Sequence, residues 1–322
     1  MNRKTRMTAL FVILLCLLIL TVCFRKTNEK QILIGASLLT MQDDFYITLN
    51  NGLLETAAQN KDYKIKVLSR NADLKLNKQI NDIEDFLQQN VDVLIVSPVS
   101  PTAIGPTIDE VNRQGIPVIT VDIKSEKGDV KTHIMSDDVE AGKICARFIA
   151  DQLNGKGEVG IITHPVLTSG INRIKGFREV MSNYPGVTII SELNAESRRE
   201  KAMSLMEDLL ISHPEVDYVI GINDVMTLGA MASIEGSGKI ENVKAVMICG
   251  GQKEAFERFE ADDPCLKGAA LIFPYSIGKT AIESAVDILK GNEVPSEILI
   301  PVKLLTHENV KELYLEWGRR PE

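Results

Sequence analysis

A chain of 322 residues with a formal net charge of -8 is too long for one small core. Its acidity disfavours a nucleic-acid partner or an anionic membrane surface, because both repel negative charge. Domains usually hold about 100 to 200 residues, so the length indicates two of them.

The first 30 residues differ from the rest of the chain. Basic residues at positions 3, 4 and 6 precede an apolar run from Met7 to Phe24, which is typical of a signal peptide or signal anchor. A cleaved signal peptide usually has small residues before the cleavage site, and the end of this segment has none. Cys23 could be lipidated, but the residue before a lipidated cysteine is normally Gly, Ala or Ser, and here it is Val22. An uncleaved helix of about 18 residues is near the lower limit for spanning a bilayer. Lipidation and a retained helix both predict an extracytoplasmic protein that is tethered to the cell membrane by a lipid or a helix.

From Gln31 onward, short runs rich in Val and Ile alternate with longer amphipathic stretches. The expected strands cover residues 32–37, 64–69, 91–98, 116–122, 158–163, 187–192, 216–222, 243–250 and 266–273. Helices are expected near 169–183, 197–212, 224–235, 252–262 and 274–291. Alternation of strand and helix implies parallel pairing with right-handed crossovers.

Two such series predict two doubly wound parallel sheets, and therefore two domains with a cleft between them. The boundary is expected near residues 132–138, because a hydrophobic run starts there without a preceding helix. The last pieces, residues 274–291 and 298–305, could return to the first domain and cross again.

Ligands of such sheets bind beyond the carboxyl ends of the strands, so the residues there are the candidates for a site. They combine carboxylates, an arginine, amides and aromatic rings: Asp43, Asp44, Phe45, Tyr46, Asp122, Arg173, Asn223, Asp224 and the GGQ of residues 250–252.

This set of side chains matches a polyhydroxy ligand. Carboxylates only accept hydrogen bonds, Arg only donates them, and Asn does both, whereas each hydroxyl of a diol can donate and accept. Phe45 and Tyr46 could pack flat faces on the ligand's C–H surface. Asp43 and Asp44 at a helix start would repel a phosphate, so a nucleotide site is disfavoured.

Each residue of the first loop also has a structural explanation. Asp43 or Asp44 could cap the helix that begins near Phe45, and capping and ligand contact could divide between the two carboxylates. Phe45 and Tyr46 could instead be core residues of the first helical turn.

The other candidates have similar alternatives. Asp224 is better explained as a helix cap than as a ligand contact. Arg173 could be a solvated helix charge, and Asp122 could pair with Lys124 or start a turn.

Several look-alikes of catalytic motifs fail on context. The SIGK of residues 276–279 lacks the companion motifs of serine hydrolases, and the EGSGK of residues 235–239 leads into a strand where a phosphate loop leads into a helix. The four histidines, at positions 133, 164, 213 and 307, have no ligand spacing. We therefore expect no metal, no cofactor and no enzymatic activity.

Four stretches, in the right order, resemble the type I periplasmic sugar-binding proteins of ABC importers, in particular the ribose-binding group. The stretches are FYITLNNGLLETAAQ, GIPVITVDIKSEKGDVKTHIMSDDVEAGK, NRIKGF and INDVMTLGAM. This group shares its fold with the ligand domain of lac repressor relatives, but a DNA-binding repressor is disfavoured because a membrane segment stands where a helix-turn-helix should be. The resemblance covers about Ile32 to Leu305.

The resemblance implies two lobes joined by a three-crossing hinge. The N-terminal lobe would contain residues 31–135 plus 271–301, and the C-terminal lobe residues 136–270 plus 302–322. The ligand contacts of the family fall on Asp43, Phe45, Tyr46, Asp122, Arg173 and Asn223.

Three departures from the ribose-binding group concern the same site. Ile123 stands where that group has Arg, Gly250 replaces the aspartate of its GFDG motif, and Ile272 replaces a Gln. Each missing polar contact costs about 1 to 3 kcal/mol when its partner is buried. Ribose itself is therefore disfavoured unless Gln252 or Ser197 compensates, and a larger, deoxy or less hydroxylated ligand is expected.

Two functions fit this expectation. The first is an extracytoplasmic solute-binding protein that closes around a monosaccharide-like ligand and presents it to an ABC permease. The second is a membrane-tethered sugar-sensing co-receptor for a histidine kinase or chemoreceptor. Only seven residues separate Phe24 from Ile32, a reach of at most about 25 Å, so a retained anchor would hold the lobes against the membrane.

Overall fold

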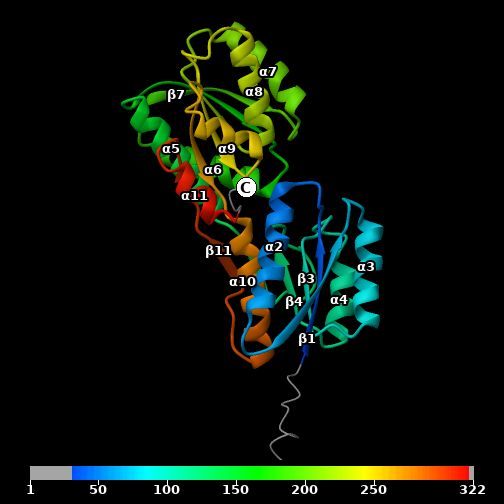
Figure 1. Cartoon of the computed structure of the whole chain (residues 1–322). Helices are drawn as coiled ribbons and strands as arrows, with labels where there is room; N and C mark the ends of the chain where they lie inside the picture. The colour runs from blue at the N-terminus through cyan, green and yellow to red at the C-terminus, as the bar shows by residue number, and fades with distance from the viewer. Residues whose placement is uncertain (1–30, 319–322) are drawn as a thin grey trace, which may run out of the picture.

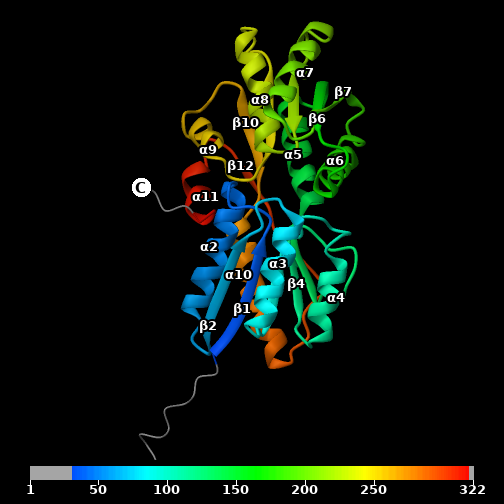
Figure 2. The same cartoon turned by 90° about the vertical axis from the view of Figure 1, so that its right-hand side faces the viewer.

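The computed structural model describes residues 31–318 as two α/β lobes, each built on a six-stranded sheet (Figure 1). The leader predictions fall on residues 1–30, which lie outside the described residues. Figure 2, turned by 90°, shows the two lobes end to end. Within residues 31–318, no helix combines the length and apolarity that a membrane span requires.

The N-terminal lobe is built on a fully parallel sheet with the strand order β11-β5-β4-β3-β1-β2. Its strands are β1 (Gln31–Leu38), β2 (Lys64–Asn71), β3 (Val93–Val96), β4 (Val118–Val121), β5 (Thr132–Ser136) and β11 (Glu297–Ile300). Helices α2 (Asp44–Gln59) and α10 (Pro274–Lys290) cover one face, and α3 (Leu76–Gln88) and α4 (Gly105–Arg113) cover the other (Figure 1). Because both faces are covered, the central strands β3 and β4 are buried at every position, and Thr120 is their one polar residue.

The C-terminal lobe repeats this plan with the strand order β12-β10-β9-β8-β6-β7. Its strands are β6 (Lys156–Thr163), β7 (Gly186–Asn194), β8 (Tyr218–Gly221), β9 (Lys244–Cys249), β10 (Leu266–Leu271) and β12 (Lys303–Leu305). Its helices are α5 (Asp138–Gln152), α6 (Thr168–Met181), α7 (Arg199–Ser212), α8 (Asp224–Gly236), α9 (Lys253–Glu260) and α11 (Val310–Glu316). Helix α5 packs on α6, and α7 packs on α8.

The chain passes between the sheets after β5, after β10 and after β11. The prediction of parallel sheets is wrong for one strand, since β12 pairs with β10 in the antiparallel direction. The reason is topological: β12 follows β11 directly and enters the second sheet from the edge at which that sheet's parallel strands end. The predicted lobe boundaries stay a prediction, which the membership of the strands in the two sheets supports.

A close approach of α5 and α6 fixes one wall of the region between the lobes. A Cβ atom at Gly142 of α5 would lie 1.8 Å from the backbone oxygen of Arg173 on α6, so only glycine fits at this contact. The two helices therefore touch through backbone atoms, which sets the positions of the side chains at their amino-terminal ends.

Candidate ligand-binding cleft

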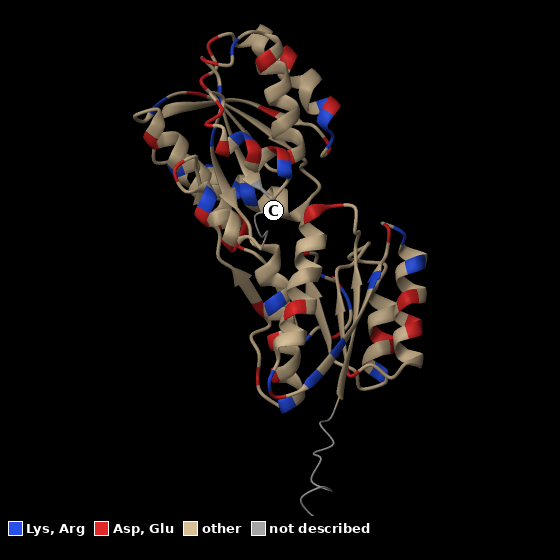
Figure 3. Cartoon of the chain, viewed as in Figure 1, with Lys and Arg blue, Asp and Glu red and all other residues tan. Residues whose placement is uncertain are grey.

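A hollow of about 220 Å³ lies between the lobes, at the carboxyl ends of the parallel strands. The N-terminal lobe contributes residues from the start of α2 and the end of β4. The C-terminal lobe contributes Arg173 of α6 and residues at the ends of β8, β9 and β10. Its lining is Asp43, Phe45, Tyr46, Asp122, Arg173, Asn223, Asp224, Val225, Ile248, Gly250, Gln252 and Ile272. Figure 3 shows acidic residues at the first turn of α2, on the side that faces the upper lobe.

The sequence-predicted residues mostly meet at this hollow. Nine of the eleven line it, whereas Ile123 and Ser197 do not. Sequence reasoning missed Val225 and Ile248, whose apolar side chains gave no signal apart from their places beside predicted strand ends.

The first loop combines a helix cap with two buried rings. Asp43 is the N-cap of α2, and its Oδ1 accepts a hydrogen bond from the backbone N–H of Phe45 at 2.9 Å. The alternative in which Asp44 provides the cap is therefore wrong, since Asp44 is the first residue of the helix. The rings of Phe45 and Tyr46 are edge-on with centroids 5.1 Å apart, and both belong to the core while also lining the hollow.

Asp122 is held by Tyr46 at the end of β4. The Tyr46 hydroxyl donates a short hydrogen bond to Oδ2 of Asp122 and accepts a longer one from Ser97 at 3.4 Å. Burial raises the pKa of Asp122 to about 6, the Tyr46 hydrogen bond and Arg173 oppose that rise, and two neighbouring carboxylates add to it. Lys124 pairs with Glu297 at 3.3 Å, so the proposed pair of Asp122 with Lys124 is wrong.

The backbone of Asp122 is itself unusual. Its φ is +62°, in the left-handed region, and its N–H donates to the Ile134 carbonyl oxygen at 2.8 Å. Aspartate and asparagine tolerate this region better than most residues. The strand end is thus turned so that a short polar side chain enters the hollow.

Arg173 is anchored at the wall formed by α5 and α6. Its Nε donates to Asp138 at 2.7 Å, and its Nη1 donates to the Ile222 carbonyl oxygen at 2.6 Å. The side chains of Arg173 and Asp138 are only 12% and 6% exposed, so the alternative of a solvated helix charge is wrong. Burial raises the pKa of Asp138, and the charge of Arg173 counteracts this effect.

Asn223, and not Asp224, caps α8, and both residues line the hollow. Asn223 is the N-cap of α8, since its Oδ1 accepts from the N–H of Met226 at 3.0 Å. The explanation of Asp224 as the cap is wrong: its Oδ2 accepts from the N–H groups of Gly250 at 2.9 Å and Gln252 at 3.3 Å. Asp224 therefore fixes the loop after β9 against the start of α8, while it lines the hollow.

Ser197 lies one hydrogen bond behind the lining. Its hydroxyl accepts from Nδ2 of Asn223 at 3.3 Å and lies 3.1 Å from Nδ1 of His164. This chain of polar contacts orients the Asn223 amide, which already caps α8 through its oxygen. Ser197 can thus affect a ligand through Asn223 without touching it.

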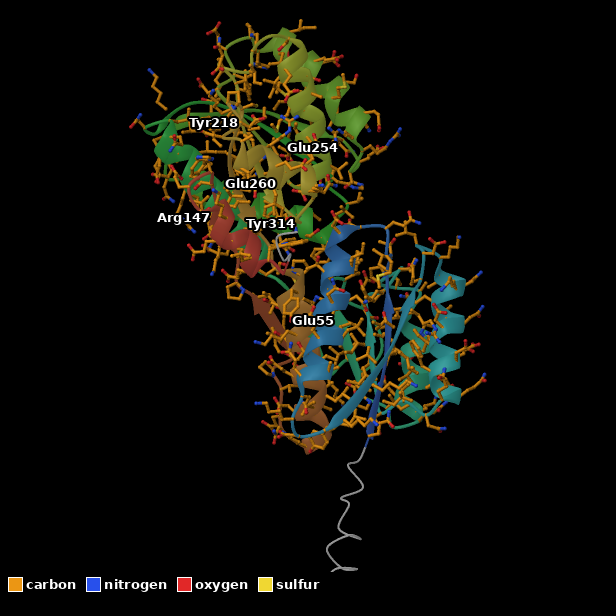
Figure 4. The ribbon with its side chains drawn as sticks, in the orientation of Figure 1. Glu55, Arg147, Tyr218, Glu254, Glu260 and Tyr314 are labelled. Carbon is orange, nitrogen blue, oxygen red and sulfur yellow. The ribbon has the colours of Figure 1, made fainter. Side chains whose placement is uncertain are left out.

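The C-terminal helix supports the loop after β9. Trp317 is fully buried, its ring lies edge-on to Phe256 of α9, and Tyr314 of α11 makes a similar contact; Tyr314 is labelled in Figure 4. Gly251 has a φ of +104°, and a Cβ atom there would lie 1.9 Å from the Trp317 ring. The sequence carried no sign that its only tryptophan packs beneath the candidate site.

Among the described residues, no group of three His, Cys, Asp or Glu side chains is arranged to hold a metal ion. A second hollow of about 540 Å³ lies between α7 and α8, where apolar residues such as Met203, Leu210 and Ile211 form the walls. It lacks the set of converging polar groups that distinguishes the cleft between the lobes.

The fold and the interlobe site define a bilobal binding protein. Residues 34–293 match the family model described as a periplasmic binding protein domain, so the chain belongs to that family. A ribose import binding protein from Bacillus subtilis (strain 168) is 34% identical over 284 residues, which cover 87% of this chain and 89% of the relative.

Solved structures give the same result. An ABC transporter solute-binding protein from Bacillus halodurans C-125 with bound myo-inositol has a TM-score of 0.77 at 27% identity, covering 90% of this chain and 100% of its own. The fructose-binding periplasmic domain of a hybrid two-component system has a TM-score of 0.75 at 26% identity, covering 88% and 95%. The fold is therefore that of the type I periplasmic binding proteins.

Proposed function

We propose that the chain is an extracytoplasmic solute-binding protein that holds a monosaccharide-like ligand between its lobes and presents it to an ABC sugar importer. The observation that carries the proposal is the convergence of side chains from both lobes on one hollow. Asp43 and Asp122 reach it from the N-terminal lobe, and Arg173 and Asn223 reach it from the C-terminal lobe. The proposed activity involves no catalysis.

Closure follows from the division of the site. A ligand that contacts both lobes at once binds the closed arrangement more tightly than the open one, so it shifts the population toward closure by that difference in affinity. The three chain passages between the sheets provide the hinge, and the closed form is the state that a membrane partner can distinguish.

The lining also limits the ligand. Val225, Ile248 and Ile272 give the wall an apolar section, and Gly250 adds no side chain to the lining. A hydroxyl placed against this section would lose its hydrogen bonds to water without replacement. The ligand is therefore deoxygenated, or larger and apolar, where it faces these three residues.

Thermal denaturation across a panel of pentoses, hexoses, deoxy sugars and polyols tests the proposal. A ligand at about a thousandfold excess over its dissociation constant raises the free energy of unfolding by about 4 kcal/mol. Asp122→Ala is expected to lose the response while retaining the fold, and Asp129→Ala, an exposed carboxylate of the same lobe, is the control. A panel without any response, or an unchanged response in Asp122→Ala, contradicts the proposal.

The second candidate is a sugar-sensing co-receptor of a membrane kinase. It is favoured by the likeness to the fructose-binding domain of a hybrid two-component system and by the short distance between the apolar leader and the first strand. Neighbouring genes distinguish the two functions: permease and ATPase genes support import, and a kinase gene without them supports sensing.

A further inference from the structure

The N-terminal lobe offers the ligand only hydrogen-bond acceptors. The polar side chains that it places in the hollow are Asp43, Asp122 and Tyr46. The Tyr46 hydroxyl already donates to Asp122, and Oδ1 of Asp43 is occupied by the N–H of Phe45. What remains for a ligand is carboxylate oxygen, which accepts hydrogen bonds and cannot donate them.

The C-terminal lobe supplies the side-chain donors of the lining, from Arg173, Asn223 and Gln252, together with the Asp224 carboxylate, whose Oδ2 accepts from two backbone N–H groups. Arg173 has five N–H groups, of which one contacts Asp138 and one contacts the Ile222 oxygen, so three are left for the hollow. Asn223 uses its oxygen as a cap and one amide hydrogen on Ser197, which leaves the other hydrogen. Among the lining side chains, the donors that remain for a ligand thus lie in the C-terminal lobe.

The lining of the hollow also contains more negative than positive side chains. Three carboxylates line the hollow, those of Asp43, Asp122 and Asp224, against the single guanidinium of Arg173. That guanidinium is already paired with the buried Asp138. Among residues 31–318, no lysine lines the hollow. Two of the three carboxylates, Asp43 and Asp122, face the ligand from the N-terminal lobe, and Asp43 lies close enough to Asp122 to raise the pKa of Asp122.

A neutral hydroxyl and an ammonium group differ in how they fit this face. A hydroxyl that donates to Asp43 or Asp122 keeps two lone pairs, and these would be surrounded by carboxylate oxygens without a donor. An ammonium group has three donors and no lone pair, so all of its hydrogen-bonding capacity can be met by acceptors. Its charge also balances the excess of carboxylates, and charge-assisted hydrogen bonds are the stronger kind.

We infer that the ligand is a monosaccharide-sized amino sugar or amino polyol whose ammonium group lies on Asp43 and Asp122, with its hydroxyl or carbonyl oxygens toward Arg173 and Asn223. This inference rests on the proposed function, and it narrows the ligand class to a cation. The apolar residues Val225, Ile248 and Ile272 pack against its C–H edge.

Calorimetric titration with matched pairs tests the inference at about pH 7, where Asp122 is mainly ionised. The pairs are D-glucosamine with D-glucose, D-galactosamine with D-galactose, and 1-amino-1-deoxy-D-sorbitol with D-sorbitol, and N-acetylated hexosamines serve as uncharged analogues. In at least one pair the amine is expected to bind about tenfold or more tightly than its hydroxyl counterpart.

The variant Asp43→Asn tests whether the charge of Asp43 causes the preference for the amine over its hydroxyl counterpart. Asn caps helices as well as Asp does, so the start of α2 is retained. The ratio of amine to hydroxyl affinity is expected to fall about tenfold in this variant and to stay unchanged in Asp129→Asn, which removes the same charge from an exposed position.

If the neutral sugar or polyol of each pair binds as tightly as the corresponding amine, the inference is wrong and the proposed function is unaffected. An unchanged ratio in Asp43→Asn overturns the placement of the ammonium group. If no member of any pair binds and no sugar of the wider panel does, the inference fails together with the proposed function.

Discussion

Replacing Asp122 by Asn isolates the energetic consequence of burying one carboxylate in the cleft. The variant keeps the size of the side chain, an oxygen that can accept from Tyr46, and compatibility with the positive φ at this position. It removes only the ability to ionise. Asp43, Asp138 and Arg173 are the charged groups that face Asp122, and all three stay in place.

The direction of the pKa shift of Asp122 determines whether its ionisation stabilises or destabilises the folded protein. The pKa of Asp122 is about 6 in the folded protein and 3.8 in the reference state, so folding favours its protonated form. This contribution to stability is complete below about pH 4 and is lost as the pH rises through 6. The difference between the two pKa values corresponds to about 3 kcal/mol, and we expect about 2 to 3 kcal/mol for a partly buried group.

Urea denaturation of the ligand-free proteins measures this quantity. At about pH 7.5, Asp122→Asn is expected to be more stable than the native chain by about 2 to 3 kcal/mol, and near pH 4 the two are expected to be equal. His133 acts in the opposite sense, because burial lowers its pKa to about 4 and its contribution is lost as the pH falls below 6.5. Since both proteins contain His133, its effect cancels in the difference.

When a cognate ligand is present, the native chain is expected to become more stable than Asp122→Asn. The native chain then gains about 4 kcal/mol at a thousandfold excess of ligand, and the variant gains little. If Asp122→Asn is less stable than the native chain at pH 7.5 without ligand, or if the difference between them does not change with pH, the assignment of a destabilising buried carboxylate is wrong.

Three further substitutions test the structure around the cleft. Arg173→Met leaves the buried Asp138 unpaired and should cost about 3 to 5 kcal/mol in urea denaturation, most of which Asp138→Leu in the same chain should recover; failure to recover contradicts the buried pair. Gly142→Ala forces α5 and α6 apart and should lower stability by about 3 kcal/mol in thermal denaturation, and a neutral result would refute the backbone contact. Trp317→Ala should cost about 3 to 5 kcal/mol and weaken ligand binding through Gly251, which calorimetry would detect; unchanged affinity would show that the loop does not need this support.

Most of the fold could be predicted from the sequence because its signals are local. Residues 93–96 and 118–121 are buried on both faces of a sheet, so they form short runs that are apolar except for Thr120. The helix predicted for residues 274–291 extends from Pro274 to Lys290, and Gly291 ends it with a φ of +80°. Such features depend on residues that are neighbours in the chain.

Part of the candidate site could be predicted for a similar reason. Parallel strands end at one edge of their sheet, so the sequence alone groups Asp43, Asp122 and Asn223 by their places after strands. Position along the chain did not show which carboxylate caps a helix and which one fixes a loop. Asp224 was assigned to the cap that Asn223 provides, because both residues suit an N-cap and only the geometry distinguishes them.

The sequence by itself determined the alternation of elements, the two lobes and the polar character of the cleft. Only the tertiary structure decided that Arg173 pairs with Asp138, that Trp317 supports the loop at Gly251, and that β12 runs antiparallel. These features join residues far apart in the chain, and their energies depend on distance and burial. Distance and burial are defined only after packing has brought the partners together, so they cannot be read from the sequence.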